Sequence, residues 1–210
     1  QSVANSINLS SGQTGVKAVF DGNPTTGIQL IAEDGRNIIL EDAGTNTETV
    51  GLALDGVYSG TFTLISSDGS PIELDTTTGD ISNTGLAVGK FSGSNSGAVG
   101  AAVGANAFAT GDVVLNGVPV GPSQGSFDTA SSANQESSAI SKAAAINKVS
   151  DRTGVRAEVN STIVNGGTIT DGSGQTGNVD INGVTINIAY SASDTATDIQ
   201  NTVLSAVNNK

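Results

Sequence analysis

A short helix, a glycine reversal and a strand are encoded in residues 139–159, and the second half of this unit recurs near the start of the chain. Ile146-Asn147 followed by Thr153–Ala157 matches Ile7-Asn8 followed by Thr14–Ala18, at the same spacing and without a gap. Similar units in series are typical of an architectural chain, because repeated supersecondary elements bury their apolar faces together. The repetition therefore constrains the fold before any other feature does.

The order of elements within this unit follows from its apolar spacing. Ile140, Ala143, Ala144 and Asn147 are spaced three and four residues apart. This spacing places them on one face of a helix. The polar run at 150–152 and Gly154 end the helix, and we expect Gly154 to adopt a left-handed conformation. Val155–Val159 then alternates apolar and charged residues, which is the period of a half-buried strand.

Two Asn-Gly hairpins complete the unit. Val113–Val120 and Val179–Ile188 each consist of two apolar runs joined by Asn-Gly, a strong hairpin signal. The second hairpin is followed by a capping box at Thr195–Asp198 and by an amphipathic helix. The module of hairpin, helix and Thr-Gly-Val strand thus occurs once whole and twice in part. Its structural motif residues are Asn116, Gly117, Thr153, Gly154, Val155, Ile181, Asn182, Gly183, Val184, Thr14, Gly15 and Val16.

Further turns predict the rest of the fold. Asp34-Gly35 and Asp68-Gly69 each lie between two apolar runs, which predicts two more hairpins. Residues 85–104 are rich in glycine and predict a loose connection, so we expect two domains, 1–108 and 109–210, which the chain could form either serially or interleaved. The expected fold class is α+β and predominantly β, with antiparallel hairpins and two or three short packed helices. Residues 2–9 should be the tail of a helix, and such ends indicate a piece cut from a series of modules.

The composition excludes several classes of function. The chain has 210 residues, a net charge of −12 and no cysteine, histidine, methionine or tryptophan. The charge disfavours binding to nucleic-acid phosphates, and without cysteine neither disulfides nor thiolate chemistry is available. No apolar run approaches the roughly 20 residues of a membrane-spanning helix. The core must be built from valine, isoleucine, leucine and alanine.

Several segments resemble one family. The hairpin Ile181–Ile186 (Ile-Asn-Gly-Val-Thr-Ile), followed by a helix and the Thr-Gly-Val strand, resembles the repeated motif in the variable outer region of bacterial flagellins. Residues 30–38, 60–69 and 84–93 resemble flagellin segments as well. The long terminal helices that form the filament core in that family have no counterpart here. The resemblance implies a solvent-facing outer part of a flagellin without its polymerising ends.

Two pairs of adjacent acidic residues are candidates for catalytic chemistry. Glu33-Asp34 and Glu41-Asp42 are paired carboxylates, as general acid–base catalysis uses, but the first pair suits an exposed turn. The commonest general base, histidine, is missing. Residues 171–174 and Asp180 are faintly similar to oxygen-rich calcium loops without their spacing. A flexible polar linker explains them better.

Other motifs have structural explanations too. The serines at 131–132 and 137–138 precede or open the central helix, where helix caps prefer them. Residues 160–162 match the N-glycosylation pattern, and residues 93–97 are a glycine motif without a clear phosphate cradle. The three Asn-Gly pairs begin at Asn116, Asn165 and Asn182. They are turn residues first and also candidate deamidation sites.

We therefore expect a structural component of the bacterial flagellar filament, secreted and extracellular, that supports motility and surface display. Its partners in the intact filament are other flagellin subunits, whereas the fragment alone is expected to be a monomer. We expect no enzymatic activity, no cofactor, no metal, no nucleic acid and no membrane partner. The alternative is a binding module from a filament cap or hook-associated protein, or from a repeat adhesin.

Overall fold

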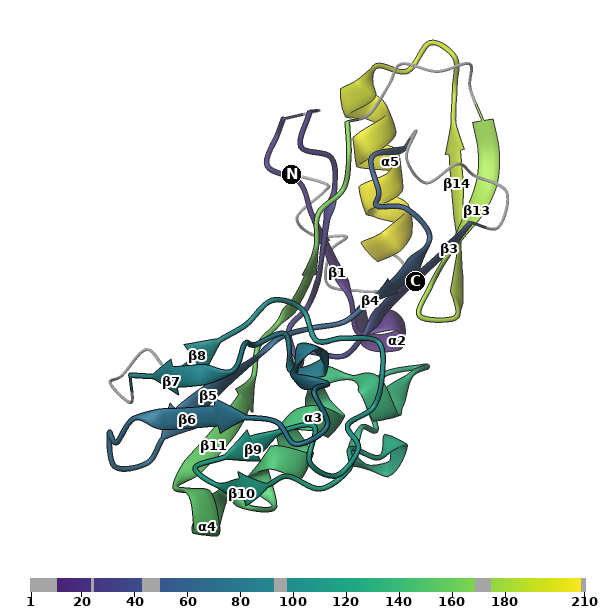
Figure 1. Ribbon diagram of the computed structural model, residues 1–210. Coiled ribbons are helices and arrows are strands. Elements are labelled where there is room, and N and C mark those ends of the chain that lie inside the picture. The colour runs from purple at the N-terminus through teal and green to yellow at the C-terminus, as the bar shows by residue number, and fades with distance from the viewer. Residues whose placement is uncertain (1–10, 24, 43–49, 93–97, 169–174, 209–210) are drawn as a thin grey trace. The chain divides into compact units, whose positions relative to one another are not determined.

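The structure is a computed structural model that describes residues 11–23, 25–42, 50–92, 98–168 and 175–208. The chain forms two compact units, each built from separate segments (Figure 1). The first unit comprises Gln1–Glu33, Ile38–Tyr58 and Ile163–Lys210, and the second comprises Asp34–Asn37 and Ser59–Thr162. The expected helix tail at 2–9 lies outside the described residues.

The boundaries of these units differ from those of the expected domains, 1–108 and 109–210. The expected boundary falls inside the second unit, which runs without a break from Ser59 to Thr162. The glycine-rich stretch does not separate two cores, because its apolar residues Leu86, Ala98 and Val103 are buried in the core of the second unit. High glycine content marked turns within one unit and not a linker between two.

The second unit contains two antiparallel sheets and one main helix. Its elements are β5 (Phe62–Ser66), β6 (Ile72–Asp75), η2 (Ile81–Thr84), β7 (Gly89–Phe91), β8 (Ala98–Val99), β9 (Val114–Leu115), β10 (Val118–Pro119), η3 (Gly125–Phe127), η4 (Gln135–Ser137), α3 (Ala139–Asn147), α4 (Ser150–Thr153) and β11 (Val155–Val159). The strand orders are β10-β9-β6-β7 and β11-β5-β8. Helix α3 packs on β11 and β5.

The first unit repeats this plan. Its elements are α2 (Ser11–Thr14), β1 (Lys17–Val19), β2 (Gln29–Ala32), β3 (Ile38–Asp42), β4 (Gly56–Tyr58), β12 (Thr162–Val164, beginning at the unit boundary), β13 (Gln175–Ile181), β14 (Val184–Tyr190) and α5 (Ala196–Asn208). The strand orders are β14-β13-β3-β4 and β1-β2-β12. Helix α5 packs on β14 and β1, and Figure 1 shows it alongside the β13–β14 hairpin.

The two units match in register as well as in strand order. In the first unit Leu40 of β3 lies opposite Gly56 and Ile181, and in the second unit Leu74 of β6 lies opposite Gly89 and Leu115. The difference is the order along the chain. The helix and last strand follow the hairpin directly in the second unit, whereas α2 and β1 precede everything else in the first. The first unit is a circular permutation of the second, so the two partial modules of the sequence form one whole module.

The described residues form four β-sheets and a few short helices, so the fold class is confirmed as α+β and predominantly β. All strand pairs with a defined register in these residues are antiparallel. Each unit has its own core, which is aliphatic in the first unit and also contains Phe62 and Phe108 in the second. The first core includes Leu30, Leu40 and Ile188, and the second includes Leu64, Leu115 and Ile146. Burial of such side chains, at about 25 cal/mol per Å² of apolar surface, is the main stabilising term in both.

The Asn-Gly hairpins are confirmed, but the Asp-Gly hairpins are wrong. β9 pairs with β10 and β13 pairs with β14 across their Asn-Gly turns. By contrast, β2 and β3 flank Asp34-Gly35 and belong to different sheets, as do β5 and β6 around Asp68-Gly69. Each Asp-Gly does turn the chain, with φ of 75° at Gly35 and 79° at Gly69. The two strands that flank each turn do not pair with each other, because each is hydrogen-bonded into a different sheet.

The expected helix face is only partly right. Ala143 is buried, but Ile140 and Ala144 are half-buried and Asn147 is exposed. The buried residues of α3 are Ala139, Ser141, Lys142, Ala143, Ala145 and Ile146. Four of them, Ala139, Lys142, Ala143 and Ile146, keep the spacing of three and four, shifted by one residue from the expected face. A lysine occupies a core position, which hydrophobic patterning alone does not anticipate.

Candidate functional site

The asparagine of the β13–β14 turn joins three segments of the first unit. Asn182 adopts φ 52°. Its main-chain N–H donates to the Ile39 carbonyl at 3.0 Å, and its Oδ1 accepts from the Ile39 N–H at 2.8 Å. Its Nδ2 donates to the Thr14 carbonyl at 2.8 Å. The side chain is 8% exposed, and it ties the hairpin to β3 and to the end of α2.

The second unit contains the same arrangement around Asn116, which has φ 48°. Its main-chain N–H donates to the Glu73 carbonyl at 2.9 Å, and its Oδ1 accepts from the Glu73 N–H at 2.8 Å. Its Nδ2 donates to the Thr153 carbonyl at 2.8 Å. Asn116 is exposed, unlike Asn182. We call Asn116 and Asn182, with these bonds, the asparagine clamps.

Each clamp ends on a Thr-Gly-Val reversal. Gly15 and Gly154 have φ of 69° and 67°, which confirms the left-handed conformation expected at Gly154 and explains the glycine. The N–H of Gly15 donates to Ser11, and that of Gly154 to Ser150, both at 2.8 Å. The threonine hydroxyl, two residues before each valine, accepts the valine N–H at 3.1 Å. In both units these hydrogen bonds fix the end of the helix to the start of the following strand.

The remaining motif residues serve the same scaffold. Gly117 and Gly183 both adopt φ 78° as second turn residues. Val16, Val155 and Ile181 are buried in their cores. Val184 is half-buried and lies opposite Ile181 in the hairpin ladder. The structure thus brings the predicted motif residues together in two equivalent clusters, one in each unit. The asparagine side chains of each cluster form hydrogen bonds with the backbone of other segments of the same unit.

A buried lysine in the second unit was missed by the sequence analysis. Lys142 of α3 has no exposed surface, and its Nζ donates to the carbonyls of Asn83 at 2.9 Å and Gly104 at 2.5 Å. The ammonium lies 5.3 Å from the centre of the Phe108 ring. None of the ion pairs of the described residues involves it. Burial lowers the pKa of Lys142 to about 8.

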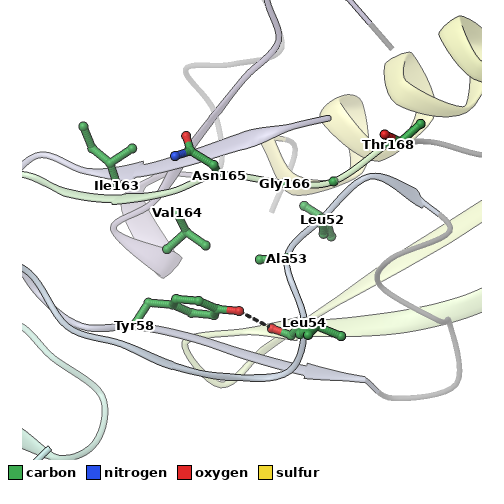
Figure 2. Close-up of a pocket in the computed structure, with 10 residues that line it drawn as sticks. Leu52, Ala53, Leu54, Tyr58, Ile163, Val164, Asn165, Gly166 and Thr168 are labelled. Carbon is green, nitrogen blue, oxygen red and sulfur yellow. Dashed lines mark hydrogen bonds between the residues drawn. The ribbon is translucent and has the colours of Figure 1, made fainter. Parts of the chain in front are cut away.

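The first unit has an open groove of about 530 Å³ (Figure 2). It is lined by Leu52, Ala53, Leu54, Tyr58, Ile163, Val164, Asn165, Gly166, Gly167 and Thr168. Leu54 and Ile163 are 59% and 53% exposed. The Tyr58 hydroxyl donates to the Leu54 carbonyl at 2.7 Å, as Figure 2 shows, and fixes one wall. The groove lacks an acid–base pair among these residues.

The paired carboxylates lie at surface positions with structural partners. Glu33 is exposed and 2.8 Å from the Lys17 Nζ, and Asp34 is exposed and 2.7 Å from an Arg36 guanidinium nitrogen. Glu41 and Asp42 are exposed at the end of β3. Exposed ion pairs of this kind contribute roughly 0–1 kcal/mol. Both pairs are therefore solvent-exposed surface groups.

The remaining candidates divide between described and undescribed residues. Residues 171–174 and 93–97 lie outside the described residues, whereas Asp180 is half-buried on β13 opposite Glu41 and Thr185. Within the described ranges, no three histidine, cysteine or acidic side chains form a group that could hold a metal ion.

The serine and glycosylation motifs are occupied by structural hydrogen bonds. Ser138 caps α3, since its Oγ accepts the Ser141 N–H at 3.1 Å. The Asn160 Nδ2 donates to the hydroxyls of Thr61 and Thr63 at 2.9 and 3.0 Å. These bonds join the start of β5 to the residue after β11. The capping box before α5 is also present, with the Asp198 N–H donating to the Thr195 Oγ1 at 3.3 Å.

In the part of the chain that the structure describes, no helix has the length and apolarity needed to cross a membrane. Comparison of the chain with protein-family models, with characterised proteins and with solved structures gave no match.

Proposed function

We propose that the chain is a solvent-exposed outer part of a bacterial flagellin, a structural component of an extracellular filament. The observation that supports it best is the asparagine clamp, which recurs in both units with the same three hydrogen bonds. A clamp that joins hairpin, neighbouring strand and reversal makes each module a self-contained body. Repetition of such bodies favours an architectural role over a catalytic one.

The distribution of charge supports the same role. Among the described carboxylates, only those of Asp112 and Asp128 are buried. Most of the described negative charge therefore lies at the surface of this acidic chain, whose net charge is −12, and mutual repulsion keeps crowded copies apart in water. A filament surface displays many copies of one chain at high local concentration, so an acidic exterior suits it. Its partners would be other subunits of the filament, and no catalytic turnover is proposed.

The second candidate is a binding module of a filament cap, a hook-associated protein or an adhesin. The groove of the first unit favours it, because Leu54 and Ile163 expose large apolar side chains beside it. Apolar concave surfaces with few polar groups are common ligand sites. A structural subunit needs no such groove.

The test uses the protein in its native setting. Antibodies raised against this chain should label filaments sheared from the source cells along their whole length in immunogold electron microscopy. Labelling confined to filament tips would favour a cap protein, and labelling of the cell wall would favour an adhesin. Absence of label from the filaments, with the antigen found inside the cells, would refute an extracellular filament role.

A further inference from the structure

The three Asn-Gly pairs of the chain differ in how firmly their asparagine side chains are held. In an Asn-Gly pair the glycine nitrogen can attack the asparagine side-chain amide, because glycine has no side chain to hinder the approach. Asn116 and Asn182 have both amide atoms bonded to the backbone of other segments, and both sit at φ near 50°. Attack would break those bonds, so the fold opposes it.

The side chain of Asn165 is not held by hydrogen bonds to the backbone of other segments that the structure describes. It is exposed, and its one side-chain hydrogen bond among the described residues comes from the Gln29 Nε2 to its Oδ1 at 2.8 Å. Its Nδ2, which would leave as ammonia, has no described acceptor. Figure 2 shows its side chain next to Gly166 and on the opposite side of the chain from the side chain of Val164, which is buried.

We propose that Asn165-Gly166 is a site of spontaneous covalent modification, at which the folded protein deamidates while the two clamp asparagines are protected. The Gly166 nitrogen forms a bond to the Asn165 Cγ, and the bond from Cγ to Nδ2 breaks. The Gly166 N–H proton leaves with the amide group as ammonia, which gives a five-membered succinimide. Water then opens the ring at either carbonyl and leaves aspartate or isoaspartate. No oxidant, reductant or cofactor takes part.

The modification changes the first unit at a tight backbone contact. A Cβ built on Gly166 would lie 1.9 Å from the Gly51 carbonyl oxygen and 2.6 Å from that of Ile28. Isoaspartate inserts one extra atom into the main chain directly before this contact. It also replaces the neutral amide on the groove wall with a carboxylate. Deamidated protein should therefore have a less stable first unit, with an added negative charge beside Gln29.

The experiment measures the three sites in one protein. The intact chain is incubated at mildly alkaline pH and 37 °C, then cut before its aspartates, which places Asn116, Asn165 and Asn182 on separate peptides. Mass spectrometry follows deamidation, and an isoaspartyl methyltransferase with labelled methyl donor detects isoaspartate. We expect Asn165 to react at least roughly tenfold faster than either clamp asparagine, which corresponds to the hydrogen bonds that each clamp would lose.

The controls separate fold from sequence. In concentrated urea the three sites should react at similar rates, because the protection belongs to the folded state. The Asn165→Gln variant keeps an amide but disfavours the five-membered ring, so it should abolish the fast reaction and leave the other two sites unchanged. Equal rates at the three sites in the folded chain, or faster reaction at Asn116 or Asn182, would overturn the proposal.

Discussion

Replacing each clamp asparagine with glycine isolates the contribution of its side chain. Glycine accepts the left-handed torsions that Asn182 and Asn116 adopt, at 52° and 48°. Asn182→Gly and Asn116→Gly therefore remove the side-chain bonds without straining the turn. The main-chain bond to Ile39 or Glu73 stays in place. What is lost in each case is one acceptor for an N–H and one donor for a threonine carbonyl.

The two substitutions should lower the free energy of unfolding by different amounts, because the two clamps differ in burial. Asn182 and Ile39 are each 8% exposed and Thr14 is 0% exposed, so the groups left behind have little access to water. An unsatisfied buried group costs about 1–3 kcal/mol, which places the cost of Asn182→Gly at ~3 kcal/mol. Asn116 and Glu73 are exposed, so water replaces part of the loss. We expect about 1 kcal/mol for Asn116→Gly.

The tyrosines allow the first unit to be followed by itself. The chain has no tryptophan, and both of its tyrosines, Tyr58 and Tyr190, belong to the first unit. Urea unfolding is recorded by tyrosine fluorescence for the first unit and by far-UV circular dichroism for both. Asn182→Gly should lower the fluorescence midpoint strongly, whereas Asn116→Gly should shift the part of the dichroism transition that the tyrosines do not report.

Asn134 provides the matched control. It is exposed at φ 54° and is neither in a hairpin turn nor in a clamp. Asn134→Gly makes the same chemical change, and we expect its effect to stay within about 0.5 kcal/mol. If Asn182→Gly behaves like this control, the clamp contributes nothing beyond an asparagine in a left-handed turn, and the reasoning is refuted.

The other expectations concern the second unit. Burial lowers the pKa of Lys142 from 10.5 to about 8, so between these pH values the unfolded chain binds more protons than the folded chain. The free energy of unfolding should therefore rise from pH 8 to pH 10.5, by up to about 3 kcal/mol. Lys142→Met should abolish this rise when urea unfolding is measured as a function of pH. Ile146→Ala should cost ~2–5 kcal/mol in the same assay and Ile140→Ala much less, and the reverse order would restore the face expected from sequence. Gly154→Ala should cost about 1 kcal/mol or more from its positive φ alone, because the nearest atom to a Cβ there is 3.6 Å away; an unchanged midpoint would contradict this. Residues 59–162 expressed alone should give dispersed amide signals in NMR, and a collapsed spectrum would show that this unit depends on the rest of the chain.

Local signals predicted much of the local structure, although Asn165-Gly166, which was also expected to form a turn, is not a turn and neither residue has a positive φ. Asn-Gly specified two hairpins because both residues of such a turn need positive φ, which these two residues tolerate. Thr-Gly-Val specified the reversals for a similar reason, at Gly15 and Gly154. Asp-Gly at 34–35 and 68–69 specified turns but not partners. A turn signal fixes the path of a few residues, whereas strand pairing depends on which sheet buries each face.

Long-range features were beyond the patterns used. The buried position of Lys142 depends on two carbonyls, those of Asn83 and Gly104, far from it in sequence. The sequence contains one further signal of the fold. Gly51-Leu52-Ala53 repeats as Gly85-Leu86-Ala87, and the paired glycines have φ of 76° and 73°. This second internal repeat would have revealed that the first half of the chain contains two copies of one strand connection.

The interleaving of the units has a geometric basis in the second unit. In that unit β7 and β8 are joined by residues 92–97, whereas the equivalent strands of the first unit, β4 and β12, are separated by almost the whole second unit. A module can replace a loop only if its two ends lie close together. They do, because β5 and β11 pair antiparallel with Phe62 opposite Val159, and the Asn160 N–H donates to the Thr61 carbonyl at 3.0 Å. The module that begins at β5 and ends at β11 can therefore stand between β4 and β12, where its counterpart has only residues 92–97 between β7 and β8, and both cores stay intact.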